Sequence, residues 1–389
     1  MARILFAWEM GEGFGHLVPL RPVLEALVAE GHTLIIAAVD IRTAHSVLGH
    51  LTTQIVQAPM LNDLQFHLGR YAEGAADLLT MNGFADKNSL FGRHHAWRQL
   101  AALFKPDLIL AEHSPGALLM ARALSIPAIH AGTGFTLPPE RRPILFPGFS
   151  PKISTASEDA ILPHFNTLIE KDGGQPLVML ADLYNRVAKR FLLSFEELDH
   201  LGPRNGVTYY GAELPDQGET PEWPSGGPRV FAYLKPFAAL NDFLSAINEL
   251  SISLLMVPDR IDPAILKKHE SKHIRFTTQR QNMRAVVEQA DLITFNGNHG
   301  TAAAGLLGGV PMLAFPLHQE QESCARRMAN AGLGAALLRN RQGKVLPLLE
   351  TLLNSETQRE ACQKAAQRYH AFDYQNSVRD MVVQMREPL

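Results

Sequence analysis

The sequence predicts an α/β fold with two doubly wound domains, each built on a parallel sheet. Short apolar runs alternate with helical patterns along the chain, which is typical of parallel α/β layers. The length of 389 residues and the hydrophobic content of 46% favour two domains, each with its own core. We expect an N-terminal domain at 1–213, a linker at 214–228 and a C-terminal domain at 229–389.

The N-terminal half opens with the clearest strand–helix–strand unit. Its expected elements are a strand at 4–8, a helix at 17–31, and strands at 33–39, 106–113 and 126–132, with a further helix around 116–126. The loop 10–16 joins the first strand to the first helix. Gly31 ends that helix, because glycine readily adopts the left-handed backbone of a helix terminus.

Residues 214–228 are crowded with Pro and Gly and lack apolar periodicity, which is why we expect a linker there. Five strands separated by helices are predicted after it, at 229–235, 251–257, 273–278, 291–295 and 311–315. In open parallel sheets a ligand binds beyond the carboxyl ends of the strands. Because the loops 10–16 and 296–301 lie at such ends, we expect ligands to bind between the two halves.

Composition argues against several classes of partner. The net charge is −3 and the longest basic clusters are doublets, so nucleic acid is not expected as a partner. Cys324 and Cys362 indicate neither a disulfide framework nor a metal knuckle, and they fit a reducing compartment. The N-terminus is predicted to be a strand rather than a signal peptide, and no apolar stretch approaches the roughly 18 residues of a membrane span. We therefore expect a soluble, cytoplasmic protein.

A candidate anion site lies in the segment 291–321, where a strand runs into a Gly-broken loop, a helix of small residues and a second strand. Helix-initial N–H groups lack intrahelical partners and carry partial positive charge, so they can bind a diphosphate. Gly297 and Gly300 let the backbone approach a ligand, and Glu320 and Gln321 after the second strand suit hydroxyls. This arrangement predicts a sugar-nucleotide site.

The loop 10–16 carries three alternate glycines and ends at His16. A dinucleotide-binding fingerprint would have glycine in place of His16, yet Asp40 closes the second strand where a ribose-binding acid is expected, so a nicotinamide enzyme stays open. Alternatively, His16 faces the cleft as a general base, since an imidazole titrates near neutrality and can take a proton from a hydroxyl. A loop histidine that only caps the helix is the third interpretation.

Two segments carry a resemblance to a known family. Residues 11–32 (GEGFGHLVPLRPVLEALVAEGH) and 295–334 (FNGNHGTAAAGLLGGVPMLAFPLHQEQESCARRMANAGLG) together resemble the inverting glycosyltransferases of family 1, which include UDP-glycosyltransferases and macrolide glycosyltransferases. The resemblance implies a GT-B fold of two facing Rossmann-like domains, the N-terminal one binding the acceptor and the C-terminal one the nucleotide sugar. It also implies that neither a metal nor a cofactor takes part, and that the last helix packs back on the N-terminal domain.

The resemblance assigns two roles by position in the N-terminal half. His16 would be the general base. Glu112, where the family usually has Asp, would orient the imidazole and stabilise the imidazolium. A solvated loop acid beside His113 is the alternative interpretation of Glu112.

In the C-terminal half the resemblance places the donor on Asn296, Gly297, Asn298, His299, Gly300, Thr301, Glu320 and Gln321. Asn296 stands where the family usually has a histidine. Lys235 would assist the phosphates from the end of a strand, and Gln281 would lie near the base. Ala304 replaces a glutamate that often binds ribose hydroxyls, so both UDP and dTDP stay open as the donor nucleotide.

The expected function is metal-independent, inverting transfer of a sugar from UDP or dTDP to a hydroxyl of a small apolar natural product, such as a polyketide, flavonoid or lipid. Candidate apolar pocket residues within 60–100 and 134–150 are Met60, Phe66, Met81, Phe84, Phe91, Trp97, Phe135, Phe146 and Phe149. Two alternatives stay open. One is a sugar-nucleotide-binding auxiliary protein without transfer activity; the other is a different GT-B enzyme, such as a UDP-N-acetylglucosamine 2-epimerase or a lipid-linked murein transferase.

Overall fold

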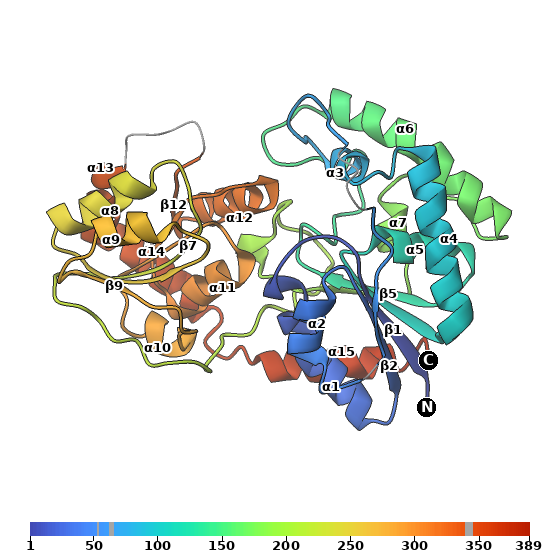
Figure 1. Ribbon diagram of the computed structural model, residues 1–389, viewed down its shortest axis with the longest axis horizontal. Helices are drawn as coiled ribbons and strands as arrows, with labels where there is room; N and C mark the ends of the chain where they lie inside the picture. The colour runs from blue at the N-terminus through green and yellow to red at the C-terminus, as the bar shows by residue number, and fades with distance from the viewer. Residues whose placement is uncertain (53, 62–65, 339–344) are drawn as a thin grey trace. The chain divides into compact units, whose positions relative to one another are not determined.

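The computed structural model describes residues 1–52, 54–61, 66–338 and 345–389, and the chain divides into two compact units. The first unit consists of Met1–Ser194, Pro203–Gly211 and Asp373–Leu389, and the second of Phe195–Gly202 and Ala212–Phe372. Each unit has its own six-stranded parallel sheet (Figure 1).

The sheet of the first unit has the strand order β3-β2-β1-β4-β5-β6. Its strands are β1 (Arg3–Trp8), β2 (Thr33–Ala38), β3 (Ile55–Gln57), β4 (Leu108–Glu112), β5 (Ala128–Gly132) and β6 (Lys189–Leu192). β1 lies at the centre between β2 and β4, and every residue from Ile4 to Trp8 is buried. A run of apolar residues buried on both sides is typical of a parallel strand covered by helices on both faces.

Helices cover both faces of this sheet (Figure 1). They are α1 (Arg21–Ala29), α2 (Ile41–Leu48), α3 (Ala75–Met81), α4 (Lys87–Phe104), α5 (Pro115–Ala123), α6 (Pro151–Lys171), α7 (Asp182–Asn185) and α15 (Tyr374–Met385). The C-terminal helix α15 lies beside α1: the Tyr374 hydroxyl donates to the Pro19 carbonyl, and Arg386 pairs with Glu30. The end of the chain thus packs on the first unit.

The first helix is shorter than predicted. Residues 14–20 form two 3-10 turns, η1 (Phe14–His16) and η2 (Val18–Leu20), and α1 begins only at Arg21. Pro19 and Pro22 lie in the first turns of η2 and α1, where a missing N–H group costs no hydrogen bond. These turns keep His16 close to the end of β1.

The second sheet has the order β12-β11-β10-β7-β8-β9, so both sheets follow the same doubly wound plan. Its strands are β7 (Arg229–Leu234), β8 (Ser253–Pro258), β9 (Ile274–Phe276), β10 (Leu292–Phe295), β11 (Met312–Ala314) and β12 (Gly334–Ala336). Its helices are η3 (Glu196–Leu198), α8 (Leu240–Glu249), α9 (Pro263–Lys268), α10 (Met283–Val287), α11 (His299–Gly308), α12 (Gln319–Asn330), α13 (Val345–Asn354) and α14 (Glu356–Gln367).

This second sheet has an apolar core on each face. Alternate residues of β7 divide between them: Phe231 packs with residues of α11 and α12, whereas Val230 and Ala232 pack with residues of α8 and α13. The period of two is that of a β-strand, in which successive side chains point to opposite faces.

The sequence does not predict the short strands β3, β6 and β12. β12 is only Gly-Ala-Ala, without the β-branched or aromatic residues that indicate a strand, and it forms by backbone pairing with β11. Residues 214–228, expected as a linker, group with the second unit. Glu219 N–H donates to the Arg280 carbonyl, and Trp223 Nε1 donates to Gln289, so this segment is held by hydrogen bonds along its course.

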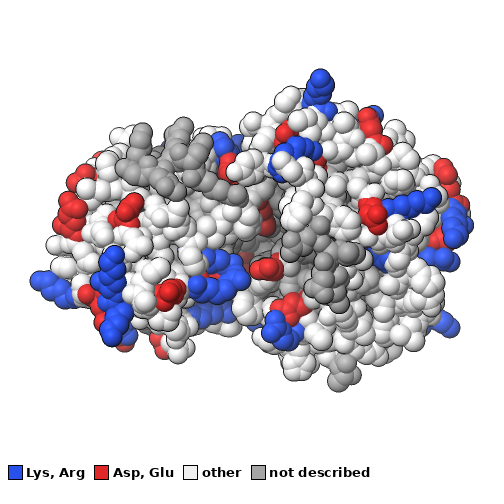
Figure 2. All heavy atoms as spheres, turned by 45° about the horizontal axis from the view of Figure 1, so that its top comes forward, with Lys and Arg blue, Asp and Glu red and all other residues white. Residues whose placement is uncertain are grey.

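Among the residues that the structure describes, no helix combines the length and the apolar character that a membrane crossing requires. On the face drawn in Figure 2, acidic and basic side chains are interspersed over both units. This mixing of charges on the face drawn agrees with the small net charge of −3.

Candidate active site

The loop after β1 places His16 beside the sheet. Gly11 and Gly13 have φ angles of 92° and 84°, a left-handed backbone that suits glycine. A Cβ on Gly11 would clash with Nε2 of His16, so glycine at this position also makes room for the imidazole. Glycines 11 and 13 therefore set the path of the loop, and Gly11 sets the place of the ring.

His16 is bound to Glu112, as the resemblance implies. Nδ1–H of His16 donates to Oε2 of Glu112 at 2.7 Å, and both side chains are buried. Glu112 is the last residue of β4 and pairs in register with Trp8 of the neighbouring β1. With Nδ1 bound to a carboxylate, Nε2 is the nitrogen that can accept a proton.

The His16 ring lies in a stack of three rings. Its centroid is 5.4 Å from that of Trp8 and 5.6 Å from that of His113, with an interplanar angle of 23° in both pairs. Burial lowers the pKa of His113 to about 3, with further lowering by His16 and His130, so this second imidazole is neutral at neutral pH. Burial raises the pKa of Glu112, while His16 and the Thr136 hydroxyl counter that rise.

Glu9 is a buried carboxylate that the sequence analysis does not single out as a site residue. Its Oε2 accepts from the Gly116 backbone N–H at 2.6 Å, and its Oε1 accepts from Trp97 Nε1 at 3.1 Å and Arg93 Nη1 at 3.2 Å. Burial raises the pKa of Glu9 and Arg93 opposes that rise. Glu9 thus fixes the end of β1 against α4 and α5. Its sequence signal is a charge immediately after an apolar strand.

A pocket opens next to this site within the first unit. It is lined by Met10, Ala75, Leu78, Leu79, His113, Pro115, Phe135, Thr136, Pro138, Phe146 and Tyr184. Of the apolar residues expected to line an acceptor pocket, only Phe135 and Phe146 lie here, whereas Phe84 and Trp97 are fully buried in the core. Residues 62–65 of the expected segment lie outside the described residues.

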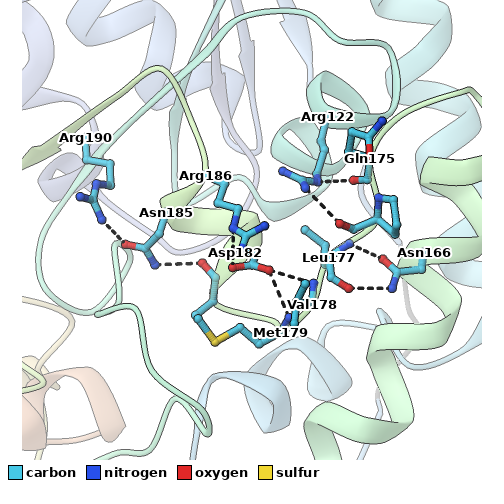
Figure 3. A network of polar contacts seen from close by, with 12 residues as sticks. Arg122, Asn166, Gln175, Leu177, Val178, Met179, Asp182, Asn185, Arg186 and Arg190 are labelled. Atoms are coloured by element: carbon cyan, nitrogen blue, oxygen red, sulfur yellow. Dashed lines mark hydrogen bonds and ion pairs between the residues drawn. The ribbon is translucent and has the colours of Figure 1, made fainter.

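A polar network surrounds α7 (Figure 3), the helix that carries the pocket residue Tyr184. Asp182 accepts from the backbone N–H groups of Val178 and Met179 and pairs with Arg186 at 2.9 Å. Asn185 donates to the carbonyl of Pro138, itself a pocket residue, at 3.2 Å. The network therefore fixes α7, which carries Tyr184, and the chain at Pro138 with it.

In the second unit the predicted phosphate loop follows β10 and leads into α11. Gly297 has a φ of 92°, and a Cβ there would come within 2.5 Å of the Gln321 carbonyl oxygen, so only glycine fits. Asn298 is the N-cap residue of α11. His299, Gly300 and Thr301 form its first turn, and a Cβ on Gly300 would meet open space. The start of α11 thus has the form that can bind an anion, and diphosphate binding there stays a prediction.

Asn296 and Gln321 use their side chains to support this loop. Asn296 is buried; its Oδ1 accepts from Lys235 N–H at 2.7 Å and its Nδ2 donates to the Phe315 carbonyl at 2.9 Å. Gln321 accepts from Leu317 N–H at 2.9 Å and donates to Asn298 Oδ1 at 3.3 Å. Both amides join strand ends and loops, which the sequence analysis did not foresee. Their direct contact with a donor stays a prediction.

The other residues predicted to bind the donor differ in their burial and in the groups that they contact. Burial lowers the pKa of His299 to about 4, and its ring stacks on His200 at 5.6 Å, so it brings no positive charge at neutral pH. Glu320 lies in the first turn of α12. Lys235 Nζ is 3.8 Å from Asp259, and Gln281 is buried with its Nε2 donating to the Gln279 carbonyl.

No protein-family model and no curated protein matches the sequence. The structure is similar to that of CalG4, the calicheamicin glycosyltransferase, with a TM-score of 0.73 at 17% identity over 99% of this chain and 98% of that one. It is also similar to the glycosyltransferase VinC in complex with dTDP, with a TM-score of 0.70 at 15% identity over 100% of both chains. The chain has the GT-B fold. The structure is also similar to that of the spinosyn rhamnosyltransferase SpnG, with a TM-score of 0.67 at 15% identity over 100% of this chain and 99% of that one.

The GT-B assignment confirms the predicted α/β class with two Rossmann-like domains. At identities of 15 to 17%, the likeness concerns the fold, and the activity depends on the residues of the site.

Proposed function

We propose that the chain is a glycosyltransferase that moves a sugar from a nucleoside diphosphate to a hydroxyl of a small, largely apolar acceptor, with inversion and without a metal. The observation that carries this proposal is the buried hydrogen bond of 2.7 Å between His16 and Glu112 at the carboxyl ends of adjacent strands. A protein that only binds sugar nucleotides would have no need for an imidazole oriented by a carboxylate. The pair therefore favours an enzyme over the auxiliary-protein alternative.

His16 is the general base of the proposed reaction. Nε2 takes the proton of the acceptor hydroxyl while that oxygen forms a bond to the anomeric carbon and the bond from this carbon to the diphosphate breaks. The electron pair of the broken bond leaves with the diphosphate. Glu112 keeps Nδ1 protonated and stabilises the imidazolium that results. Attack from the side opposite the leaving group inverts the anomeric configuration.

The N-terminus of α11 is the proposed site of the diphosphate. The N–H groups of its first turn and the helix dipole would stabilise the negative charge that grows on the leaving group, and Thr301 adds a hydroxyl in the same turn. His299 is neutral at neutral pH, so backbone groups supply more of this stabilisation. The complex of VinC with dTDP supports testing dTDP-sugars beside UDP-sugars.

Product analysis tests the proposal. The purified chain is incubated with UDP- and dTDP-sugars and a panel of hydroxylated apolar compounds, with and without EDTA. We expect a glycoside detectable by mass spectrometry, an inverted anomeric configuration by NMR, and the same rate when metals are removed. Retention of configuration, or nucleotide binding with no glycoside from any combination, would contradict the proposal.

A further inference from the structure

Tyr184 brings a phenol hydroxyl to the pocket of the first unit. Its side chain lines that pocket and is only 6% exposed. The ring lies 5.6 Å from that of His130, and His130 Nδ1–H donates to the Tyr184 carbonyl at 3.2 Å. Hydrogen bonds of Asp182 and Asn185 hold the two ends of the same short helix, α7 (Figure 3). The backbone and the ring of Tyr184 are therefore both fixed in place.

The Tyr184 hydroxyl makes no hydrogen bond to any residue in the part of the chain that the structure describes. Unlike the unpaired hydroxyl of Ser154, it is not sealed from solvent, so it faces open space, and the space beside Tyr184 is the pocket. Burial raises the pKa of this phenol above its usual range, and the carboxyls of Glu9 and Glu158 raise it further. The hydroxyl thus keeps its proton and can donate it in a hydrogen bond.

The other side-chain N–H and O–H groups on the pocket wall have partners. The His113 ring is hydrogen-bonded to the backbone of Met10, and the Thr136 hydroxyl is bonded to the carboxyl of Glu112. His113 is neutral at neutral pH, and no Lys or Arg is found among the described residues that line the pocket. A carboxylate buried there would have no cation to compensate its charge. The wall therefore favours a neutral group that accepts one hydrogen bond.

The pocket is small enough to limit what it can bind. Its cavity volume is about 20 Å³, close to the space that one water molecule needs. A whole acceptor does not fit there in this conformation, whereas a single oxygen at the end of a ligand does. Such an oxygen is hydrated in water, so it needs a donor in the pocket to replace that hydration.

Resting on the proposed function, we propose that the Tyr184 hydroxyl donates a hydrogen bond to a neutral carbonyl or ether oxygen of the sugar acceptor, carried on an apolar body. This oxygen is distinct from the hydroxyl that receives the sugar. Tyr184 takes no proton in the reaction; it determines which acceptors bind. An apolar pocket with one unpaired polar group discriminates against a ligand that leaves this group without a partner.

Three small probes of similar shape test this assignment. Acetophenone carries a carbonyl oxygen, α-methylstyrene has a CH₂ group in its place, and benzoate has a carboxylate. Dissociation constants are measured by ligand-observed NMR titration, so the test does not need sugar transfer. Tyr184→Phe removes only the hydroxyl. Tyr210→Phe is the matched control, because Tyr210 is buried in the same unit outside the pocket lining and its hydroxyl accepts from Gln384 Nε2 at 2.8 Å.

The ratio of the Kd of α-methylstyrene to the Kd of acetophenone separates the hydrogen bond from the apolar contacts that both probes share. We expect this ratio to fall about tenfold in Tyr184→Phe, the value of one well-made hydrogen bond, and to keep its wild-type value in Tyr210→Phe. Benzoate should bind the wild type more weakly than acetophenone. By thermal melting, Tyr184→Phe should be at least as stable as the wild type, whereas Tyr210→Phe, which loses a hydrogen bond of the fold, should be less stable.

An unchanged ratio in Tyr184→Phe would overturn the assignment, as would binding of no probe or tighter binding of benzoate than of acetophenone. A loss of stability in Tyr184→Phe as large as that in Tyr210→Phe would also overturn it, because the hydroxyl would then serve the fold. Failure to form any glycoside, while the ratio responds to Tyr184→Phe, would instead count against the proposed transfer.

Discussion

The charge of Glu112 depends on what surrounds it. Burial raises the pKa of this carboxyl, and the adjacent His16 is the first of the groups that lower it again. Glu112 and His16 thus stabilise each other's charged forms, which is what a base needs as it becomes an imidazolium. A neutral side chain of the same shape would keep the geometry without this stabilisation.

We therefore expect Glu112→Gln to lower kcat by up to about 10⁴-fold, the loss found when an aspartate that orients a catalytic histidine is replaced by its amide. Glu112→Asp, which keeps the charge on a shorter side chain, should lose less. The measurement is steady-state kinetics with saturating donor for both variants. A Gln variant with wild-type kcat would remove Glu112 from the mechanism.

The buried side chain of His130 makes the stability of the fold depend on pH. Burial lowers its pKa to about 4, although Nδ1–H donates to the Tyr184 carbonyl at 3.2 Å. In the unfolded chain the same group titrates near 6.5. Between these values the unfolded state binds more protons, so this contribution to stability falls as the pH drops from about 6.5 to about 4.

The comparison of the wild type with His130→Phe isolates this contribution from those of other buried groups. From pH 7 to pH 5 the free energy of unfolding should fall by about 2 kcal/mol more in the wild type than in the variant. Urea denaturation of both proteins at the two pH values measures these free energies of unfolding. Parallel losses in the two proteins would show that His130 is not kept neutral by folding.

At the scale of elements, the loop from β1 to η1 depends on where glycine is required. Gly11→Ala introduces a Cβ against Nε2 of His16 in a left-handed backbone, so the imidazole must move. Gly15→Ala is the matched control, because a Cβ there meets nothing within 4 Å. We expect the first substitution to lower kcat by about tenfold or more, since small misplacements of catalytic groups are costly. The second should leave kcat near that of the wild type, and equal activity of both variants would contradict this role of the loop.

The turn before α11 offers a second matched pair. Gly297→Ala strains a φ of 92° and brings a Cβ within 2.5 Å of the Gln321 carbonyl, so it should destabilise the fold by about 1–3 kcal/mol and weaken nucleotide binding. Gly300→Ala lies inside the helix with open space around it and should be neutral or stabilising by up to about 1 kcal/mol. Denaturation midpoints and calorimetry with dTDP and UDP compare them. Similar stabilities of the two variants would show that the turn is not constrained as described.

At the scale of the whole molecule, the sequence predicts the two Rossmann-like domains because short apolar runs and helical periodicity are local signals. Most of the central strands lie where the pattern places them. β3, β6 and β12 escape prediction because they are short and depend on pairing with a neighbouring strand. The 3-10 turn η2 escapes it because residues 18–20 continue the apolar pattern of the predicted helix, and η1 lies in what was predicted as a loop.

In the candidate site, too, some features could be predicted from the sequence and others could not. His16 and Glu112 were predicted by position, and the structure brings them together at 2.7 Å. The buried contacts of Glu9 and His113 could not be predicted, because they depend on α4, α5 and the pocket wall. Asn296 has a side chain bound to backbone groups of the residues directly after β7 and β11, a role that only tertiary structure reveals.

The most direct test of the account is His16→Ala, measured for sugar transfer and for nucleotide binding on the same preparation. A general base contributes about 10²–10⁴-fold to a rate, so transfer should fall by at least that lower bound while the Kd of dTDP or UDP stays at the wild-type value. Turnover close to that of the wild type would contradict the claim that His16, held by Glu112, is the base.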